Sequence, residues 1–274
     1  ALLASTEMFE PVAAVWSTPQ AGLHTARYGH SATAVGDRLL VAGGTGARGA
    51  ALASAELLDP GTLTWTEVAS MGSARTGHQA VPIGGKVLVI GGALPTGEGE
   101  RALAFCEIYD PETGSWTPTG SLHVPRKGHQ ATPLGDGRVL VTGGDAVPAV
   151  PYRTDSLASA ELYDPETGAW TRVADMPGGG RSRHRAVWTP AGVVVTGGIG
   201  RPRPTTGFRA AAVFDPGSGT WTVTGPLATG RWDFPAVDLA DGRMFVTGGL
   251  ALAGAAAPGP DPTELAATAE IYLP

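Results

Sequence analysis

The chain has 274 residues, a formal net charge of −6 at pH 7 and a single cysteine, Cys106. One cysteine excludes an internal disulfide framework and any zinc or redox site built on paired thiols. The N-terminus has no basic segment followed by a long apolar core, and no apolar run is long enough to span a membrane. We therefore expect a soluble, monomeric, cytoplasmic protein that needs no cofactor, with secretion after removal of a signal left open.

Short apolar segments separated by turn residues run along the whole chain and predict strands. The first repeat shows the pattern most simply. An apolar segment is followed by a tight turn at Gly36-Asp37, where positive φ is tolerated. A second apolar run ends in Gly43-Gly44, and a third ends at Asp59-Pro60 because proline cannot donate to a β-ladder. In chain order, the first predicted strands lie in residues 5–17 (two strands), 30–35, 39–44, 55–60 and 64–66.

The Gly-Gly doublet recurs about every 50 residues, a period expected of propeller blades rather than of most solenoids. Each repeat supplies four strands, which we name a, b, c and d from the inside outward. We therefore predict an all-β propeller of four-stranded antiparallel blades in a single domain, 1–274, with five blades favoured and six possible. The blades are expected at 27–68, 75–119, 126–173, 181–224 and 231–274, with residues 5–17 closing the ring. The doublets are Gly43-Gly44, Gly91-Gly92, Gly143-Gly144, Gly197-Gly198 and Gly248-Gly249, and the repeated tryptophans are Trp16, Trp65, Trp116, Trp170 and Trp221.

An apolar strand closed by Gly-Gly, then Tyr-Asp-Pro, then Trp resembles the kelch repeat, and the segments GHSATAV and SAELYDP are similar to bacterial kelch proteins. The resemblance covers practically the whole chain and implies a β-propeller. It does not imply one function, because kelch propellers include protein-binding modules and a few enzymes.

The motif R-x-x-H precedes strand a in four repeats and reads Arg231-Trp232-Asp233-Phe234 in the fifth. Strand a is innermost, so these residues are expected to surround the channel mouth. Most of the Lys and Arg residues fall in segments that should reach this face, which predicts a basic mouth that binds a small carboxylate-bearing anion. Nucleic acid is not expected, because most of the surface is acidic. The resemblance implies the same role, because in kelch modules that bind acidic peptides this arginine contacts the ligand. The matching arginines are Arg27, Arg75, Arg126, Arg181 and Arg231, and the other candidate ligand contacts are Tyr28, His78, His129, Arg183, Trp188, Trp232 and Phe234.

A structural role for the same arginines is an open alternative. Each could pair with a glutamate repeated in strand c, and each histidine could hydrogen-bond a neighbouring blade. The fourth repeat has no such glutamate near Val213. The repeated glutamates are Glu7, Glu56, Glu107, Glu161 and Glu270.

Departures from the repeat gather in the fourth and fifth copies. Asp233 is the only acid within an R-x-x-H window, and it could act as a general base with His184 or His30 as the acid. A cofactor-independent isomerase, cyclase or lyase is therefore one alternative, for which the resemblance to the kelch-like sialic-acid mutarotase gives a precedent. A scaffold that recognises an acidic peptide is another. We expect no metal site, because histidines spaced regularly around a ring would lie too far apart. Binding specificity is also expected in the long b-to-c loops, residues 93–104, 145–158, 199–209 and 250–267.

Overall fold

The computed structural model describes residues 2–18, 21–97, 99–147, 155–200, 206–239, 241–253 and 263–273. In this part of the chain, strands are the dominant element and a single 3-10 turn, η1 (Ala47–Gly49), is the only helix. The chain divides into two compact units, Ala1–Gly120 and Ser121–Pro274, which we describe separately.

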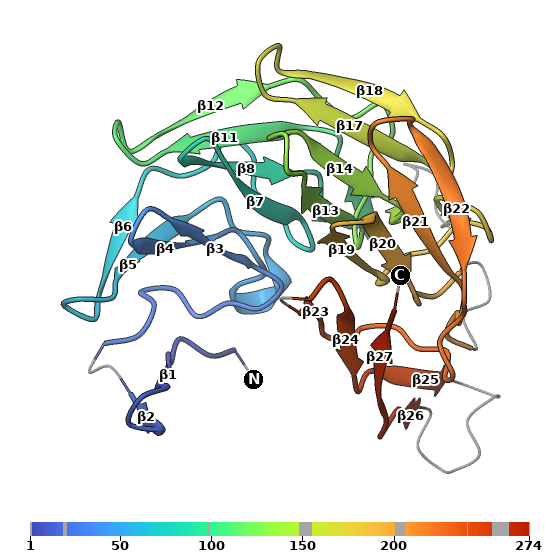
Figure 1. Cartoon of the computed structure of the whole chain (residues 1–274). Coiled ribbons are helices and arrows are strands. Elements are labelled where there is room, and N and C mark those ends of the chain that lie inside the picture. The colour runs from blue at the N-terminus through green and yellow to red at the C-terminus, as the bar shows by residue number, and fades with distance from the viewer. Residues whose placement is uncertain are drawn as a thin grey trace. The chain divides into compact units, whose positions relative to one another are not determined.

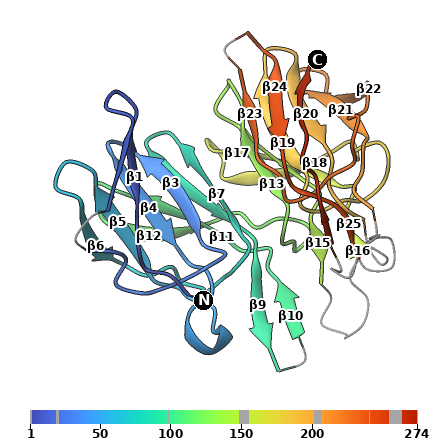
Figure 2. The ribbon, with the colours of Figure 1, turned by 90° about the horizontal axis from the view of Figure 1, so that it is seen from below.

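The first unit contains two four-stranded antiparallel sheets (Figure 1). Their a strands, β3 and β7, lie side by side, and the hydroxyl of Thr33 donates to the carbonyl of Ala80. A hairpin, β9–β10, occupies the loop between β8 and β11 and extends beyond the sheet (Figure 2). The first sheet is β3 (Ser31–Val35), β4 (Arg38–Ala42), β5 (Ala55–Asp59) and β6 (Thr64–Val68); the second is β7 (Gln79–Ile83), β8 (Lys86–Ile90), β11 (Cys106–Asp110) and β12 (Ser115–Thr119), with the hairpin β9 (Ala93–Thr96) and β10 (Gly99–Ala102).

The second unit contains two four-stranded sheets and a sheet with three described strands. Its a strands β13, β19 and β23 again lie side by side. The third sheet is β13 (Gln130–Pro133), β14 (Val139–Thr142), β17 (Ala160–Asp164) and β18 (Ala169–Val173); the fourth is β19 (Arg185–Thr189), β20 (Gly192–Thr196), β21 (Ala211–Asp215) and β22 (Thr220–Thr224); the fifth is β23 (Ala236–Asp238), β24 (Met244–Thr247) and β27 (Ala269–Tyr272). Two small hairpins lie in its b-to-c loops, β15 (Asp145–Ala146) with β16 (Asp155–Ser156) and β25 (Leu250–Ala253) with β26 (Thr263–Leu265). The central parts of the predicted specificity loops, 148–154, 201–205 and 254–262, lie outside the described residues.

Five antiparallel sheets in the predicted strand order confirm the all-β repeat fold. The fifth sheet shows strands a, b and c, whereas the other four sheets also have strand d. Strands β1 (Met8–Glu10) and β2 (Val15–Ser17) form a two-stranded sheet of their own. Closure of the fifth sheet by residues 5–17, and with it the single-domain boundary 1–274, stays a prediction.

The apolar b strands form the core of each sheet, as the sequence predicts. All of Val87–Ile90 in β8 is 0% exposed, and Val87 and Val89 pack in one cluster with Leu40 and Leu57 of the first sheet. Strand c stops at a repeated aspartate: the Asp59 carboxylate accepts hydrogen bonds from the backbone N–H groups of Gly61 and Thr62. Cys106 is buried in β11.

The Gly-Gly doublet is required by close contacts with the residue that begins strand a. Gly198 has φ +95°, and a Cβ atom built on it would lie 2.8 Å from the Cβ of His184. Gly143 has φ +58°, and its added Cβ would lie 2.8 Å from His184 Cε1 of the next sheet. The first glycine therefore packs against the next repeat and the second against its own.

Candidate functional site

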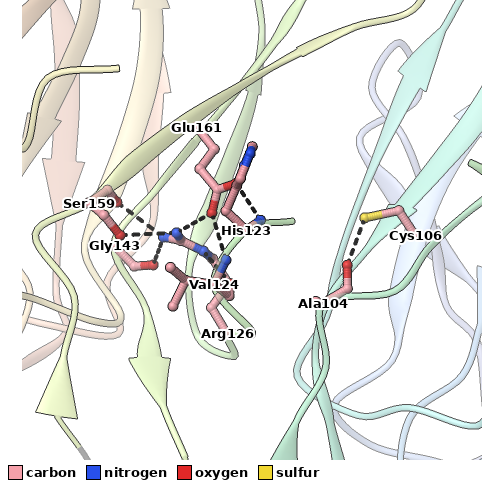
Figure 3. A network of polar contacts seen from close by, with 8 residues as sticks. All are labelled: Ala104, Cys106, His123, Val124, Arg126, Gly143, Ser159 and Glu161. Atoms are coloured by element: carbon pink, nitrogen blue, oxygen red, sulfur yellow. Dashed lines mark hydrogen bonds and ion pairs between the residues drawn. The ribbon is translucent and has the colours of Figure 1, made fainter. Parts of the chain in front are cut away.

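The five arginines that begin the R-x-x-H windows are buried inside the two units. Arg75, Arg126 and Arg231 are 0% exposed. Arg126 donates from Nη1 to the carbonyls of Gly143 (2.7 Å) and Ser159 (3.0 Å), and from Nη2 to Glu161 Oε1 (2.7 Å) (Figure 3). The same ion pair forms in three other sheets, between Arg27 and Glu56 (2.6 Å), Arg75 and Glu107 (2.6 Å), and Arg231 and Glu270 (2.7 Å).

The glutamate of each pair is held by further donors. Glu161 accepts hydrogen bonds from the backbone N–H groups of His123 (2.7 Å) and Val124 (3.2 Å), and its Oε2 lies 2.8 Å from His123 Nδ1 (Figure 3). Burial acts to raise the pKa of Glu161, but the His123 N–H and the Arg126 charge outweigh it, so the pKa lies below its ordinary value. The expectation that these arginines line an accessible mouth is therefore wrong, because all five are buried: Arg27, Arg75, Arg126, Arg181 and Arg231. All of them except Arg181 pair with a glutamate of strand c, which is the structural role that the sequence left open.

The histidines of the same windows lie mostly in the interior too. His78, His129 and His184 are at most 4% exposed, which is a correction to their expected place at the mouth. His78 Nε2 lies 2.9 Å from Ser31 Oγ, and His184 Nε2 lies 2.8 Å from Thr142 Oγ1. Burial, followed by the charge of Arg75, lowers the pKa of His78 to about 3. His30 in the first unit is exposed, and burial of part of its ring and the charge of Arg27 lower its pKa.

The aromatic residues that depart from the repeat are divided between core and surface. Phe234 is 0% exposed and packs with the core of the fifth sheet, where it takes the place of the histidine. Trp232 is 3% exposed, so Trp232 and Phe234, both expected as ligand contacts, are packing residues instead. Trp188 is half-buried against the core of the third and fourth sheets. Tyr28 in the first unit is 58% exposed.

Two charged residues do project from the second unit beside these buried positions. Arg183 Nη1 and Asp233 Oδ2 lie 2.9 Å apart, and each side chain is 45% exposed. The backbone links their positions: Arg183 N donates to the carbonyl of Gly128 (2.9 Å), and Asp233 N to the carbonyl of Arg183 (3.1 Å). Arg185 is half-buried next to them, with its guanidinium 5.9 Å from the centre of the Phe234 ring. Burial lowers the pKa of Arg185, and the Asp233 charge acts against that shift.

Arg183 and Asp233 occupy positions that are glycine in the other three repeats. Their φ angles are 54° and 49°, close to those of Gly29, Gly77 and Gly128. Of the candidate residues in the fourth and fifth R-x-x-H windows, these two are exposed, and their role in binding stays a prediction. The sequence analysis grouped them with neighbouring residues of the same windows that are buried in the structure.

One surface feature was missed by the sequence analysis. A cleft of about 410 Å³ in the first unit is lined by the a-to-b turns of both sheets and the c-to-d turn of the second. Lys86 Nζ and Asp110 Oδ2 pair at 2.8 Å at its edge. No residue of the repeat signals this cleft, because turn residues of the same kind occur in every copy. Across the described part of the chain, no cluster of three or more His, Cys, Asp or Glu side chains could hold a metal ion. No helix in that part is long and apolar enough to cross a membrane.

Comparison with known proteins places the chain in a family. Residues 29–249 match the model of the KLHDC2/KLHL20/DRC7 Kelch-repeats domain, so the chain belongs to the Kelch-repeat family. Domains of this family are commonly scaffolds for protein interaction. The fold prediction made from the doublets and tryptophans is confirmed.

Similar proteins combine such repeats with other parts. Human Kelch-like protein 34 is 30% identical over 239 residues, which cover 83% of this chain and 35% of that protein. Acyl-CoA-binding domain-containing protein 4 of Arabidopsis thaliana is 28% identical over 63% of this chain and 25% of that protein. The solved structure of YjhT has a TM-score of 0.66 at 18% identity, with 82% of this chain and 73% of that chain covered, which shows a shared fold. The chain thus spans about a third of the length of Kelch-like protein 34.

Proposed function

We propose that the chain is a kelch binding module that takes a carboxylate-bearing ligand, a small molecule or an acidic peptide, at Arg183 and Arg185 in the second unit. A guanidinium suits a carboxylate because it offers two parallel N–H donors. Asp233 would accept a hydrogen bond from a hydroxyl or amino group of the same ligand. Arg185, half-buried against Phe234, would be the more rigid of the two anchors.

The carrying observation is the left-handed backbone at Arg183 and Asp233. A residue with a side chain in this conformation costs about 1–2 kcal/mol relative to glycine, and somewhat less for aspartate. An exposed ion pair stabilises the folded state by only about 0.2–1 kcal/mol. The pair therefore does not offset the strain of its own backbone. Side chains that are kept at such a cost are candidates for a role outside the fold.

The catalytic alternative finds no support in the second unit. His184, one of the two expected acids and the one in this unit, is fully buried, and its Nε2 is bonded to Thr142. Burial lowers its pKa well below the ordinary value, so the ring is neutral near pH 7 and is not the imidazolium that a general acid would need. Asp233 instead binds Arg183. A role in binding needs neither proton transfer nor a second acid.

The test compares Arg183→Ala with Arg243→Ala. Arg243 also sits in an exposed pair, with Asp241, so the control removes the same charge elsewhere. The probes are a hexaglutamate peptide and succinate, titrated by calorimetry. We expect the unchanged chain and the Arg243→Ala variant to bind one probe alike, and Arg183→Ala to bind it at least tenfold more weakly. Equal binding by both variants, or no binding of either probe to the unchanged chain, would overturn the proposal.

A further inference from the structure

Arg181 in the fourth sheet is a buried cation that lacks the counter-ion found in the other sheets. It is 2% exposed. Its Nη1 donates to the carbonyls of Gly197 (3.3 Å) and Ala210 (3.2 Å), and its Nη2 to that of Pro177 (3.0 Å). No carboxylate among the described residues pairs with it, and its buried Nε has no partner there. Burial lowers its pKa to about 10.

The missing carboxylate can be located by register. In the third sheet Glu161 of strand c is opposite Val141 of strand b. The equivalent pair in the fourth sheet is Ala212 opposite Val195. The other three sheets place a glutamate at this register position, opposite Val41, Val89 and Val246. The fourth sheet therefore keeps the arginine and replaces the glutamate by a methyl group.

The loop that holds the glutamate in the other sheets is also changed. In the third sheet the segment 122–126 offers two backbone N–H groups to the carboxylate. The corresponding segment, 176–181, is one residue longer and reads Met-Pro-Gly-Gly-Gly-Arg. Pro177 has no N–H group, whereas Gly178 and Gly179 are exposed, with φ +82° and +92°, and their N–H groups bond to none of the described residues.

The first of these two glycines lies next to the guanidinium. A Cβ built on Gly178 would lie 2.8 Å from Arg181 Nη2, so the glycine backbone passes close to the charge. Successive backbone N–H groups in such a glycine-rich turn form a concave donor set that binds anions. A buried charge without a partner is strongly unfavourable, whereas the same charge paired and hydrogen-bonded is tolerated.

We propose that a free monovalent anion of carboxylate size, such as formate or acetate, binds between the Arg181 guanidinium and the N–H groups of Gly178 and Gly179. It would stand where the glutamate carboxylate stands in the other sheets. This site is distinct from the exposed Arg183 surface and does not depend on it. Chloride offers the same charge without the planar pair of oxygens, so it should bind more weakly.

The experiment follows the thermal unfolding midpoint of the chain while sodium formate, acetate or chloride replaces the salt of a bulky sulfonate at constant ionic strength. If the dissociation constant is near 10 mM, we expect about 3 °C of stabilisation in 100 mM formate. The Ala212→Glu variant supplies its own carboxylate and should lose this dependence. An equal response of the unchanged chain and the variant would overturn the site.

A second variant protects the test if Ala212→Glu does not fold. Arg181→Met keeps an apolar stem of similar length and removes the cation, so the formate response should disappear. A formate response that persists in Arg181→Met would contradict the proposal. Conversely, Glu161→Ala in the third sheet opens the equivalent place there, and its midpoint should rise with formate more than that of the unchanged chain.

Discussion

The third and fourth sheets place an arginine at the same position and treat its charge differently. Arg126 is enclosed with Glu161, two backbone donors and the His123 ring. Arg181 has three carbonyl partners and an aromatic ring, Phe208, whose centre lies 5.2 Å from the guanidinium carbon. Both arginines order the segment that leads into strand a, so the carbonyl contacts are the common structural requirement. The comparison shows that the counter-ion is a separable part of the repeat.

The largest expected effect comes from breaking the complete pair. Glu161→Gln keeps the shape of the side chain and leaves Arg126 buried without a negative partner, and we expect a loss of about 3–5 kcal/mol in the free energy of unfolding. Urea denaturation measures it. Arg243→Ala, in an exposed pair, is the control and should cause no measurable change. A loss below about 1 kcal/mol for Glu161→Gln would show that the pair does not need its charge.

The histidine that follows the arginine gives a second comparison, because the fifth sheet has Phe234 in that place. The folded-state pKa of His78 is about 3, whereas the unfolded value is near 6.5. The unfolded chain therefore binds the extra proton between these values, and the stability from the neutral ring is complete above about pH 6.5 and falls as the pH drops toward 3.

His78→Phe removes this titration. We expect its free energy of unfolding to fall less steeply between pH 6.5 and 4, by up to about 1.4 kcal/mol per pH unit. Denaturation at a series of pH values measures the slope. An unchanged slope would mean that His78 protonates without loss of its packing.

A doublet glycine, Gly198, and a loop glycine, Gly179, allow the cost of backbone strain to be measured apart from the cost of close packing. Gly198 and Gly179 have φ +95° and +92°, but only Gly198 would place a Cβ against other atoms. Alanine at either position should cost about 1–2 kcal/mol for the left-handed backbone. At Gly198 the contact with His184 should add about 1–3 kcal/mol. Equal losses in the two variants would show that the doublet is selected for φ alone.

The smallest expected effect lies at the exposed pair. Arg183→Gly restores the residue type of the other sheets, which relieves about 1 kcal/mol of backbone strain and removes an exposed ion pair worth less than that. The urea midpoint should stay the same or rise slightly. A fall of more than about 1 kcal/mol in the free energy of unfolding would mean that Arg183 is a structural residue, and it would remove the main argument for the binding surface.

The repeat made the fold predictable, because Gly-Gly, Asp-Pro and Trp recur in a setting that only strands and turns satisfy. The exposure of the R-x-x-H side chains was not predictable in the same way. A recurring arginine is compatible with a surface ligand or a buried glutamate, and only the packing of strand c beside the arginine of each sheet decides between them. The pairing with Glu56, Glu107, Glu161 and Glu270 was visible in the sequence as an alternative.

The departures from the repeat were more informative, but the sequence did not show which of them are exposed and which are buried. Phe234 and Asp233 are neighbours in sequence, yet the first is buried and the second is 45% exposed. Asp233 has a left-handed backbone, φ 49°, in the bend before β23, so its side chain leaves the chain in a different direction from that of Phe234 and reaches solvent. The absence of a glutamate near Val213 was another departure visible in the sequence. The strand register shows that Ala212 occupies the position of the glutamate.

The most direct test of this account is a crystal of the chain soaked in molar bromide, since bromide scatters anomalously and at this concentration fills the site although it binds more weakly than a carboxylate. The account predicts an anomalous peak within hydrogen-bonding distance of Arg181 Nη2 and the N–H groups of Gly178 and Gly179, and no peak at that place in Ala212→Glu. No peak beside Arg181 in the unchanged chain, or an equal peak in the variant, would contradict the claim that the fourth sheet takes its counter-ion from solution.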